Sequence, residues 1–569
     1  MNEKNKNLLK RLFLLPSWKT LLIIIIICLS FATIWYLFLF GRHTLYFSNI
    51  GWTYNSGGDI LKAQIGWEWF RQEPWHFPLG RIESYGYPSG TSLTFLDAIP
   101  IMAIPLKILS PILGSKFQYL GIWTWISIFG QMLFGILILG EFSKSWVLKI
   151  LGASFLVLSP PLIFRSFIHF SLTAQWVLLA GIWFLILEYR NKFRHWGWHV
   201  LFLITMFIHF YFVAMLIPLW IASLFLWCRN EKNKWKIWIN ALAVPVTILI
   251  AGYVLGFFSI GGNNLAVNGF GYYSWNLNGF LNPFQYSAIL NLIKTNPDGG
   301  QNEGFSYLGL GEIIVFLWGL VLFLQNENVF KYKKFFIPLL AACFLEVIFA
   351  LSNVVFLNDQ ILWAFKLPDW LFNICSMFRS SGRFIWPVFY LMICFGLINL
   401  LRNVRFTTPI FIVLIFLQLI DIQPLFFEKK ATDFSTYSSP LVSDFWEAAK
   451  KTNKQIVLLP VTGTPSILNP LIIYARQSNL LLNWGNFSRI DSENVIQYAD
   501  NVWNDLAAEE PDNQTLYIFW DESWHSSEIE SFSRFMYICK VDDYKLGFST
   551  TNGLVDAGLD LEQFCEIPK

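Results

Sequence analysis

Four acidic residues are placed where they could accept protons or bind polar groups. Asp59 follows two glycines and precedes the helix-like segment ILKAQIGWEWFRQ. A positioned carboxylate accepts the proton of a hydroxyl as a new bond forms, so we expect Asp59 to be a general base or a metal-linked carboxylate; the alternative is that Asp59 caps a helix. Glu83 and Asp97 lie in the same stretch, 51–100, where they would position an acceptor or bind a divalent cation, or else serve as a solvated loop acid and a hydrogen-bonded interfacial acid. Glu303, in QNEGFSYLGLGE, is a candidate for the same substrate site or for ordering its own loop.

Basic residues near the expected outer membrane surface are candidates for binding a phosphate. His169 lies in RSFIHFSL, four residues after Arg165; both either contact a lipid phosphate or anchor the chain at the interface. Arg379 and Arg383 flank two serines and a glycine in FRSSGRFIWP, and guanidinium forks with hydroxyls suit phosphate. The alternative is an ion pair with Asp369 or another loop acid. Arginine is less expected on outer loops, which draws attention to this pair.

The composition indicates an integral membrane protein. Of the 569 residues, 55% are hydrophobic and only 14% are charged, against about 25% charged residues in soluble proteins. The net charge of +3 is too small to indicate nucleic acid as a partner. The sequence contains no CxxC, nucleotide-binding loop, GxSxG or HExxH motif, so those enzyme classes are not indicated.

The apolar runs and the basic loops together predict a topology. The N-terminus is basic and precedes an uncleaved first span, so we place it in the cytoplasm. The apolar segment 93–113 is broken by three prolines, and every strongly basic short loop becomes cytoplasmic only if this segment lies in the interface or is re-entrant. The first external loop is then 41–116. The predicted spans are about eleven: 21–40, 117–140, 148–164, 172–188, two within 198–227 split near Val213, 237–258, 308–325, 335–351, 384–401 and 408–421.

The composition changes near residue 425 to that of a soluble α/β domain. KQIVLLP and TLYIFW predict buried strands, and SENVIQYADNVWNDLAAEE predicts a helix. We therefore divide the chain into a transmembrane domain, 1–424, and a small extracytoplasmic α/β domain, 425–569. Outside the cytoplasm, Cys539 and Cys565 could form a disulfide.

A set of segments resembles a group of bacterial multi-spanning proteins, which in turn resembles the GT-C glycosyltransferase superfamily. The segments are GGDILKAQIGWEWFRQEPWHFPLG, TFLDAIPIMAIPLKILSPIL, FQYLGIW, HFSLTAQW, GFGYYSWNLNGFLNP, EGFSYLGLGE and SSGRFIWPVFY. The resemblance covers about 20–424. It implies a functional acid in the first external loop, here Asp59, and an inverting transfer from a polyprenyl-phosphate sugar on the outer face, often with a terminal extracytoplasmic domain. GGD lacks the second acid of a DxD-type signature, so the resemblance specifies neither a metal nor an acceptor.

The sequence thus predicts a GT-C-like, α-helical, multi-pass protein of the plasma (inner) membrane that acts in glycan biosynthesis of the cell envelope. The expected partners are a polyprenyl-phosphate sugar donor, membrane lipid, and a glycan, lipid or protein acceptor. A divalent cation is a candidate cofactor. The alternative functions are a transporter or flippase of a lipid-linked glycan, which would use polar residues inside the spans, and a non-catalytic scaffold.

Overall fold

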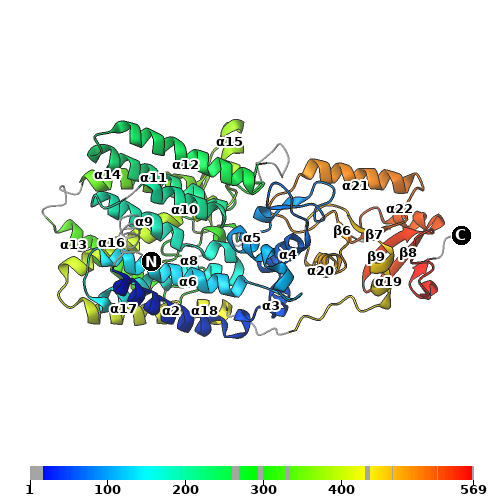
Figure 1. Cartoon of the computed structure of the whole chain (residues 1–569), viewed down its shortest axis with the longest axis horizontal. Helices are drawn as coiled ribbons and strands as arrows, with labels where there is room; N and C mark the ends of the chain where they lie inside the picture. The colour runs from blue at the N-terminus through cyan, green and yellow to red at the C-terminus, as the bar shows by residue number, and fades with distance from the viewer. Residues whose placement is uncertain are drawn as a thin grey trace, which may run out of the picture. The chain divides into compact units, whose positions relative to one another are not determined.

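The computed structural model describes residues 17–193, 195–258, 268–291, 299–326, 333–429, 436–463, 465–521 and 523–566 (Figure 1). The chain forms two compact units. The helical unit comprises Met1–Tyr46, Tyr119–Ala251 and Leu265–Asp433, and the loop–sheet unit comprises Phe47–Gln118, Gly252–Asn264 and Phe434–Lys569. Most of the predicted first external loop therefore belongs to the same compact unit as the C-terminal residues.

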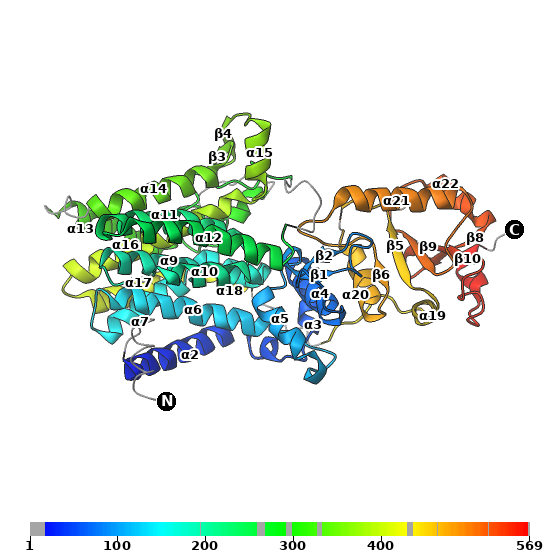
Figure 2. The same cartoon turned by 45° about the horizontal axis from the view of Figure 1, so that its top comes forward.

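The helical unit is built mainly from long apolar helices (Figure 1). A short hairpin, β3 (Val354–Leu357) and β4 (Gln360–Ala364), and the helix α15 (Asp369–Ser376) lie together at one edge of this unit (Figure 2). The other helices are α2 (Trp18–Phe40), α6 (Leu120–Gly140), α7 (Trp146–Val157), α8 (Pro160–Ile168), α9 (Trp176–Tyr189), α10 (Trp196–Met206), α11 (Phe210–Asn230), α12 (Lys234–Val254), α13 (Leu310–Leu324), α14 (Lys333–Leu351), α16 (Trp386–Asn403), α17 (Thr407–Asp421) and α18 (Gln423–Lys429).

Seven helical segments of the described chain are long and apolar enough to cross a membrane, and the bent pair α7–α8 raises this number to eight if it forms one span. The other apolar helices, α10, α13 and α17, are shorter. The seven segments are Trp18–Phe40, Leu120–Gly140, Phe170–Tyr189, Phe210–Arg229, Lys234–Val254, Lys334–Leu351 and Ser381–Asn403.

Two of the predicted spans differ from the observed helices. The predicted span 148–164 is bent by 51° between α7 and α8. Pro160 and Pro161 explain the bend, because proline lacks an amide donor and restricts the preceding residue. The run 198–227 is divided as predicted, but the break precedes α11 at His209, not Val213; the His209 ring accepts a hydrogen bond from the Tyr211 amide and so caps α11.

The apolar segment 93–113 contains only short helices. They are η2 (Leu93–Phe95), α5 (Pro100–Ile108) and η3 (Ser110–Ile112). At nine residues, α5 is about 14 Å long, which is less than half of the hydrocarbon thickness of a bilayer. This segment therefore contains no helix long enough to cross a membrane, and its interfacial or re-entrant position stays a prediction.

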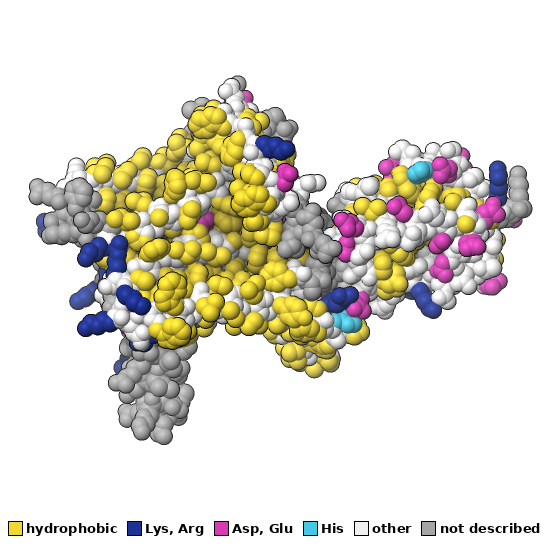
Figure 3. All heavy atoms as spheres, turned by 90° about the horizontal axis from the view of Figure 1, so that it is seen from above, with side chains coloured by type: hydrophobic (Ala, Val, Ile, Leu, Met, Phe, Trp, Pro, Cys, Tyr) yellow, Lys and Arg dark blue, Asp and Glu magenta, His cyan; other side chains and the backbone are white. Residues whose placement is uncertain are grey.

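Apolar side chains cover most of the face of the helical unit that is seen in Figure 3, and lysine and arginine gather at one end of it. Leu242, Phe344 and Val413 are examples of apolar residues that are more than 60% exposed. In water this surface would be unfavourable, since large continuous apolar patches are rare on soluble proteins. The helical unit is therefore suited to a lipid environment.

The C-terminal residues form a six-stranded sheet in the order β10-β8-β9-β7-β5-β6. The strand β5 pairs in parallel with β6 and β7, and the other pairs are antiparallel. The predicted strands and helix of this domain are confirmed by β5, β7 and α21. The elements are α19 (Asp444–Thr452), β5 (Gln455–Leu459), α20 (Asn469–Gln477), β6 (Leu481–Leu482), α21 (Ser492–Ala507), β7 (Thr515–Phe519), α22 (Ser526–Ser531), β8 (Met536–Val541), β9 (Tyr544–Ser549) and β10 (Cys565–Glu566).

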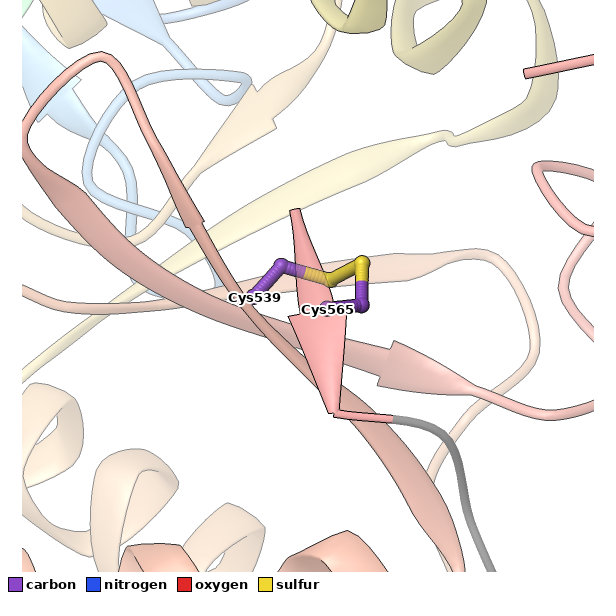
Figure 4. The surroundings of a disulfide bond; sticks show 2 residues. All are labelled: Cys539 and Cys565. Carbon is purple, nitrogen blue, oxygen red and sulfur yellow. A yellow bond between two sulfur atoms is a disulfide. The ribbon is translucent and has the colours of Figure 1, made fainter. Parts of the chain in front are cut away.

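One face of α21 helps to close the core of this sheet. Val457, Leu459 and Phe519 of the sheet pack with Leu506 of α21, and all four are almost completely buried. A disulfide between Cys539 and Cys565 joins β8 to the short edge strand β10, so the pairing expected from the sequence is present in the structure (Figure 4).

Candidate functional site

Asp59 lies in the first turn of α4 (Gly58–Gln72), which follows the short helix α3 (Gly51–Ser56). Gly57 and Gly58 have φ values of 64° and 50°, a left-handed backbone that glycine adopts without strain. This explains the GG that precedes Asp59. The N-cap position is Gly57, so Asp59 is not the N-cap residue. Its carboxylate instead lies within the first turn, where the helix dipole favours a negative charge.

Asp59 and Asp97 are brought together by a buried lysine that sequence analysis did not single out. The Lys62 ammonium lies 2.8 Å from Asp59 Oδ1 and 2.6 Å from Asp97 Oδ2. Lys62 Nζ also donates to Ser488 Oγ at 3.1 Å, and Ser488 donates to Asp97 Oδ2 at 3.2 Å. The side chains of Lys62 and Asp97 are 5% and 6% exposed, whereas that of Asp59 is 38% exposed. Asp59 is therefore the accessible end of a buried ionic network.

The electrostatics of this network keep Lys62 charged. Burial lowers the pKa of Lys62, but the Asp59 and Asp97 carboxylates outweigh burial and raise its pKa above the ordinary value. The signal in the sequence was a lysine three residues after Asp59, within an otherwise apolar helical segment. Residues three apart lie on the same face of a helix, so the pairing of Lys62 with Asp59 could have been predicted.

The backbone at Asp97 is strained. Asp97 and Ile99 have φ values of 55° and 51°. A positive φ is a real outlier for a β-branched residue such as isoleucine, and such strain is retained where the surrounding structure fixes it, often at functional sites. Here the backbone amide of Ser488 donates to the Phe95 carbonyl at 2.8 Å and helps to fix the segment.

The network supplies its own cation. A divalent ion shared by two carboxylates would occupy the place between them, and in this structure the Lys62 ammonium contacts both. Asp59 and Asp97 therefore fit an internal ion-pair network better than a shared divalent cation.

Glu83 takes a different set of contacts. Its carboxylate lies 2.8 Å from Arg81 Nε and 3.9 Å from His76 Nδ1, and the side chain is half exposed. The nearby Glu73 accepts hydrogen bonds from the backbone amides of Glu83 and Ser84. Glu83 thus lies in a local turn network, not among the contacts of Lys62.

A second charged cluster lies in the helical unit and joins three segments that are distant in sequence. Glu303 of η5 (Gly300–Gly304) lies between Arg165 of α8 and Arg383 of η7 (Ser381–Ile385). Its Oε2 accepts from Arg165 Nη2 at 2.9 Å and from Arg383 Nε and Nη2 at 2.9 and 2.5 Å. The arginine side chains are 1% and 8% exposed, and Glu303 is 27% exposed. Burial raises the pKa of Glu303, but the two guanidiniums outweigh it and hold the pKa well below the ordinary value.

Two glycines allow this cluster to form. An added Cβ on Gly382 would lie 2.9 Å from the Cα of Gly304, and one on Gly304 would lie 3.0 Å from the Cα of Gly382. The chain segments that carry Glu303 and Arg383 can therefore approach only because these positions lack side chains.

His169 lies beside this cluster and is one of the groups that lower the pKa of Glu303. Its Nδ1 lies 3.1 Å from Ser171 Oγ, and its ring lies 5.7 Å from that of His209. Because His209 Nδ1 accepts the Tyr211 amide proton, the neutral His209 ring carries its proton on Nε2 and is a donor there. The Arg383 guanidinium lies 4.8 Å from the ring centre of Tyr211. The cluster is rich in donors, as an anion site requires.

Arg379 does not take the expected place beside Arg383. Its side chain is exposed, and its guanidinium lies 5.6 Å from the ring centre of Tyr273. The second guanidinium of the cluster belongs to Arg165, which the sequence offered only as a companion of His169. The long sequence separation between Arg165 and Glu303 left no local signal for this pairing.

A buried carboxylate ties the first loop to the C-terminal domain within the loop–sheet unit. Glu68 accepts from Tyr54 Oη at 2.7 and 2.8 Å and from Gln64 Nε2 at 2.8 Å. Burial raises the pKa of Glu68, and the nearby Arg476 of α20 partly offsets this effect. Glu68 was not among the predicted site residues, and its contacts give it a structural role.

Comparison with known families gives a match over most of the chain. The family described as domain of unknown function (DUF6311) matches residues 28–423, and the DUF6311 C-terminal domain matches residues 445–547. A comparison with curated proteins finds no match.

Proposed function

The chain belongs to the DUF6311 family, and we propose that it is a membrane glycosyltransferase that moves a sugar from a polyprenyl-phosphate donor to an acceptor hydroxyl. In this proposal the transfer occurs on the outer face of the membrane, inverts the anomeric carbon and uses a GT-C-like domain of about eleven transmembrane helices.

The observation that carries the proposal is the position of Asp59 at the accessible end of the Asp59–Lys62–Asp97 network. The two inner groups are buried, and they fix the carboxylate without covering it. An adjacent ammonium favours the ionised form of a carboxylate. A fixed, ionised and accessible carboxylate is what a general base needs.

The cluster around Glu303 supports the second half of the reaction. Arg165 and Arg383 carry guanidinium groups that meet at Glu303, and their side chains are buried. Such donors stabilise negative charge on a leaving phosphate, and they are more effective where water is excluded. We assign phosphate binding to these residues, with His169 beside them.

The proposed step forms one bond and breaks one bond at the anomeric carbon of the donor sugar. The acceptor oxygen forms a bond to the anomeric carbon while the bond from that carbon to the phosphate oxygen breaks. The phosphate leaves with the electron pair of the broken bond. The proton of the acceptor hydroxyl passes to Asp59. The step requires a sugar donor and an acceptor, and it needs no oxidant.

The proposed orientation places the N-terminus in the cytoplasm and the C-terminal domain outside. The gathering of lysine and arginine at one end of the helical unit agrees with cytoplasmic loops at that end. The Cys539–Cys565 disulfide agrees with an oxidising compartment for the C-terminal domain.

The test is a transfer assay with the full chain in phospholipid nanodiscs. Polyprenyl phosphates carrying radiolabelled glucose, galactose, mannose or arabinose are supplied one at a time with envelope glycans, and label in a new glycosidic bond is measured. Arg383→Gln should raise KM for the donor by about tenfold or more, because a charge-assisted contact to phosphate is worth about 1.5–3 kcal/mol. Arg379→Gln is the matched change outside the cluster. Movement of the lipid between leaflets without any new bond would refute the enzymatic proposal.

A specific observation favours the alternative of a lipid-linked glycan transporter. Glu312 of α13 and Glu346 of α14 are completely buried, and their carboxyl oxygens have no hydrogen-bond partner among the described residues. Ionisable groups inside apolar helices are typical of transport pathways. Substitution of both by glutamine would abolish lipid movement in a transporter, whereas the proposed transferase should retain bond formation.

A further inference from the structure

A shallow pocket in the loop–sheet unit is lined by residues that do not belong to the ionic network. It is lined by Pro88, Ser89, Asn494, Gln497, Tyr498 and Asn501. The first two residues come from the loop before β2 (Thr91–Ser92), and the other four come from α21. The pocket therefore exists only where the first external loop and the C-terminal domain pack together within this unit.

The four residues from α21 form a regular polar face. Their positions are separated by three, four and seven residues, which places them on one side of the helix. Another side of α21 is apolar and buried at Val495, Ala499 and Leu506, and the last two of these belong to the core of the sheet. An exposed helix face usually carries charged side chains. On this face of α21, three of the four side chains that line the pocket are uncharged amides instead.

The pocket has a fixed aromatic side and an unused hydroxyl. The Tyr498 hydroxyl donates to Gln455 Oε1 at 3.3 Å, and its ring meets that of Tyr87 edge to face at 5.7 Å. These contacts hold the ring in place. Ser89 Oγ is buried and has no hydrogen-bond partner among the described residues.

The charge of the surroundings narrows the ligand class. The six lining residues include no charged side chain. The helix α21 carries Glu493, Asp500 and Asp505 but neither lysine nor arginine, and the carboxylate of Asp491 accepts from Asn494 Nδ2 at 2.6 Å. An anion such as phosphate would meet no counter-charge here and would be repelled.

From these features we infer that the pocket binds a neutral carbohydrate. Amide groups both donate and accept hydrogen bonds, as sugar hydroxyls do. An aromatic ring offers an apolar surface on which the C–H face of a sugar packs. The pocket recognises an uncharged, hydroxyl-rich chain, and in the proposed transferase, on which this assignment rests, that chain is the acceptor glycan.

The test is direct binding to the full chain in phospholipid nanodiscs that contain no glycoside detergent. Saturation-transfer difference NMR is recorded with maltotetraose, cellotetraose, mannotetraose and chitotetraose, with inorganic phosphate as the anionic comparison in a separate competition experiment. The double variant Gln497→Ala/Asn501→Ala removes two exposed amides from the pocket. Asn504→Ala is the matched control, because Asn504 is an exposed amide of α21 outside the lining.

We expect at least one neutral tetrasaccharide to bind and phosphate not to compete with it. The double variant should weaken binding by about tenfold or more, which corresponds to a loss of about 1.4 kcal/mol of binding free energy. Asn504→Ala should bind as the wild type does. Absence of binding by all four sugars, competition by phosphate, or equal binding by the double variant overturns it. Sugar binding without transfer would refute the proposed enzyme and leave the pocket as assigned, whereas transfer without any effect of the double variant on sugar binding would refute the pocket alone.

Discussion

Replacement of Lys62 by methionine tests whether the ionic network is a structural requirement of the loop–sheet unit. Methionine keeps most of the apolar stem and removes the ammonium, so both carboxylates lose their shared partner. Asp97 is 6% exposed, so it loses the ammonium in a place that water hardly reaches, while it keeps the hydrogen bond from the Ser488 hydroxyl. Asp59 is 38% exposed and is solvated by water when the ammonium is removed.

The magnitude follows from this difference in burial. Leaving a buried charge without its partner costs about 3–5 kcal/mol, whereas an exposed ion pair contributes about 0–1 kcal/mol. Most of the loss therefore comes from Asp97. For a domain of 150–250 residues, 1 kcal/mol lowers Tm by about 2–4 °C, so Lys62→Met should lower the Tm of this unit by about 6–20 °C.

The assay is thermal unfolding of the full chain in nanodiscs, followed by the accessibility of the loop–sheet unit to protease. Lys451→Met is the matched control, because Lys451 is an exposed lysine of the same unit. Lys62→Met/Asp97→Asn should recover much of the lost stability, since it also removes the negative charge of the buried carboxylate. The reasoning is refuted if Lys62→Met unfolds at the same temperature as Lys451→Met.

Three further predictions concern pH, redox state and topology. Folding lowers the pKa of Glu303 below its ordinary value of 4.5. The contribution of Glu303 to stability is therefore complete above pH 4.5 and is lost as the pH falls below that value. Acid should consequently lower the Tm of the wild type more than the Tm of Glu303→Gln. Replacement of Cys539 and Cys565 by serine should destabilise the sheet by about 3–4 kcal/mol, since their disulfide closes a loop with a sequence separation of 26; equal unfolding of the reduced and oxidised wild type would contradict this. For topology, Ser439→Cys and Lys192→Cys are each made in a chain whose native free cysteines are replaced by serine. A membrane-impermeant thiol reagent applied to intact cells should label Cys at position 439 and not at position 192. The reverse pattern would show the opposite orientation.

The helices and the sheet could be predicted from the sequence because their signals are local. Long apolar runs predicted the helices, and alternating and continuous apolar segments predicted β5, β7 and α21. The bend between α7 and α8 also had a local signal, the Pro160–Pro161 pair, but the apolar run concealed it. The number of membrane crossings is harder to predict, since α10, α13 and α17 are shorter than a typical span.

The charged clusters could be predicted only in part because their members are distant in sequence. Asp59, Asp97, Glu303 and Arg383 were recognised from unusual local settings. The partners of these residues were not recognised, because a pairing such as that of Arg165 with Glu303 depends on tertiary packing. The pocket beside α21 is a similar case, because two of its six lining residues come from a loop about 400 residues away in the sequence.

The central claim is that Asp59 accepts a proton during sugar transfer, and the most direct measurement is the single-turnover rate of Asp59→Asn in nanodiscs with saturating donor and acceptor. Asparagine keeps the size of the side chain and cannot act as the base, so the transfer rate should fall by about 10²–10⁴-fold. Donor binding and Tm should stay close to those of Asp556→Asn, an exposed acid of the same unit. Transfer by Asp59→Asn at the wild-type rate would contradict the account.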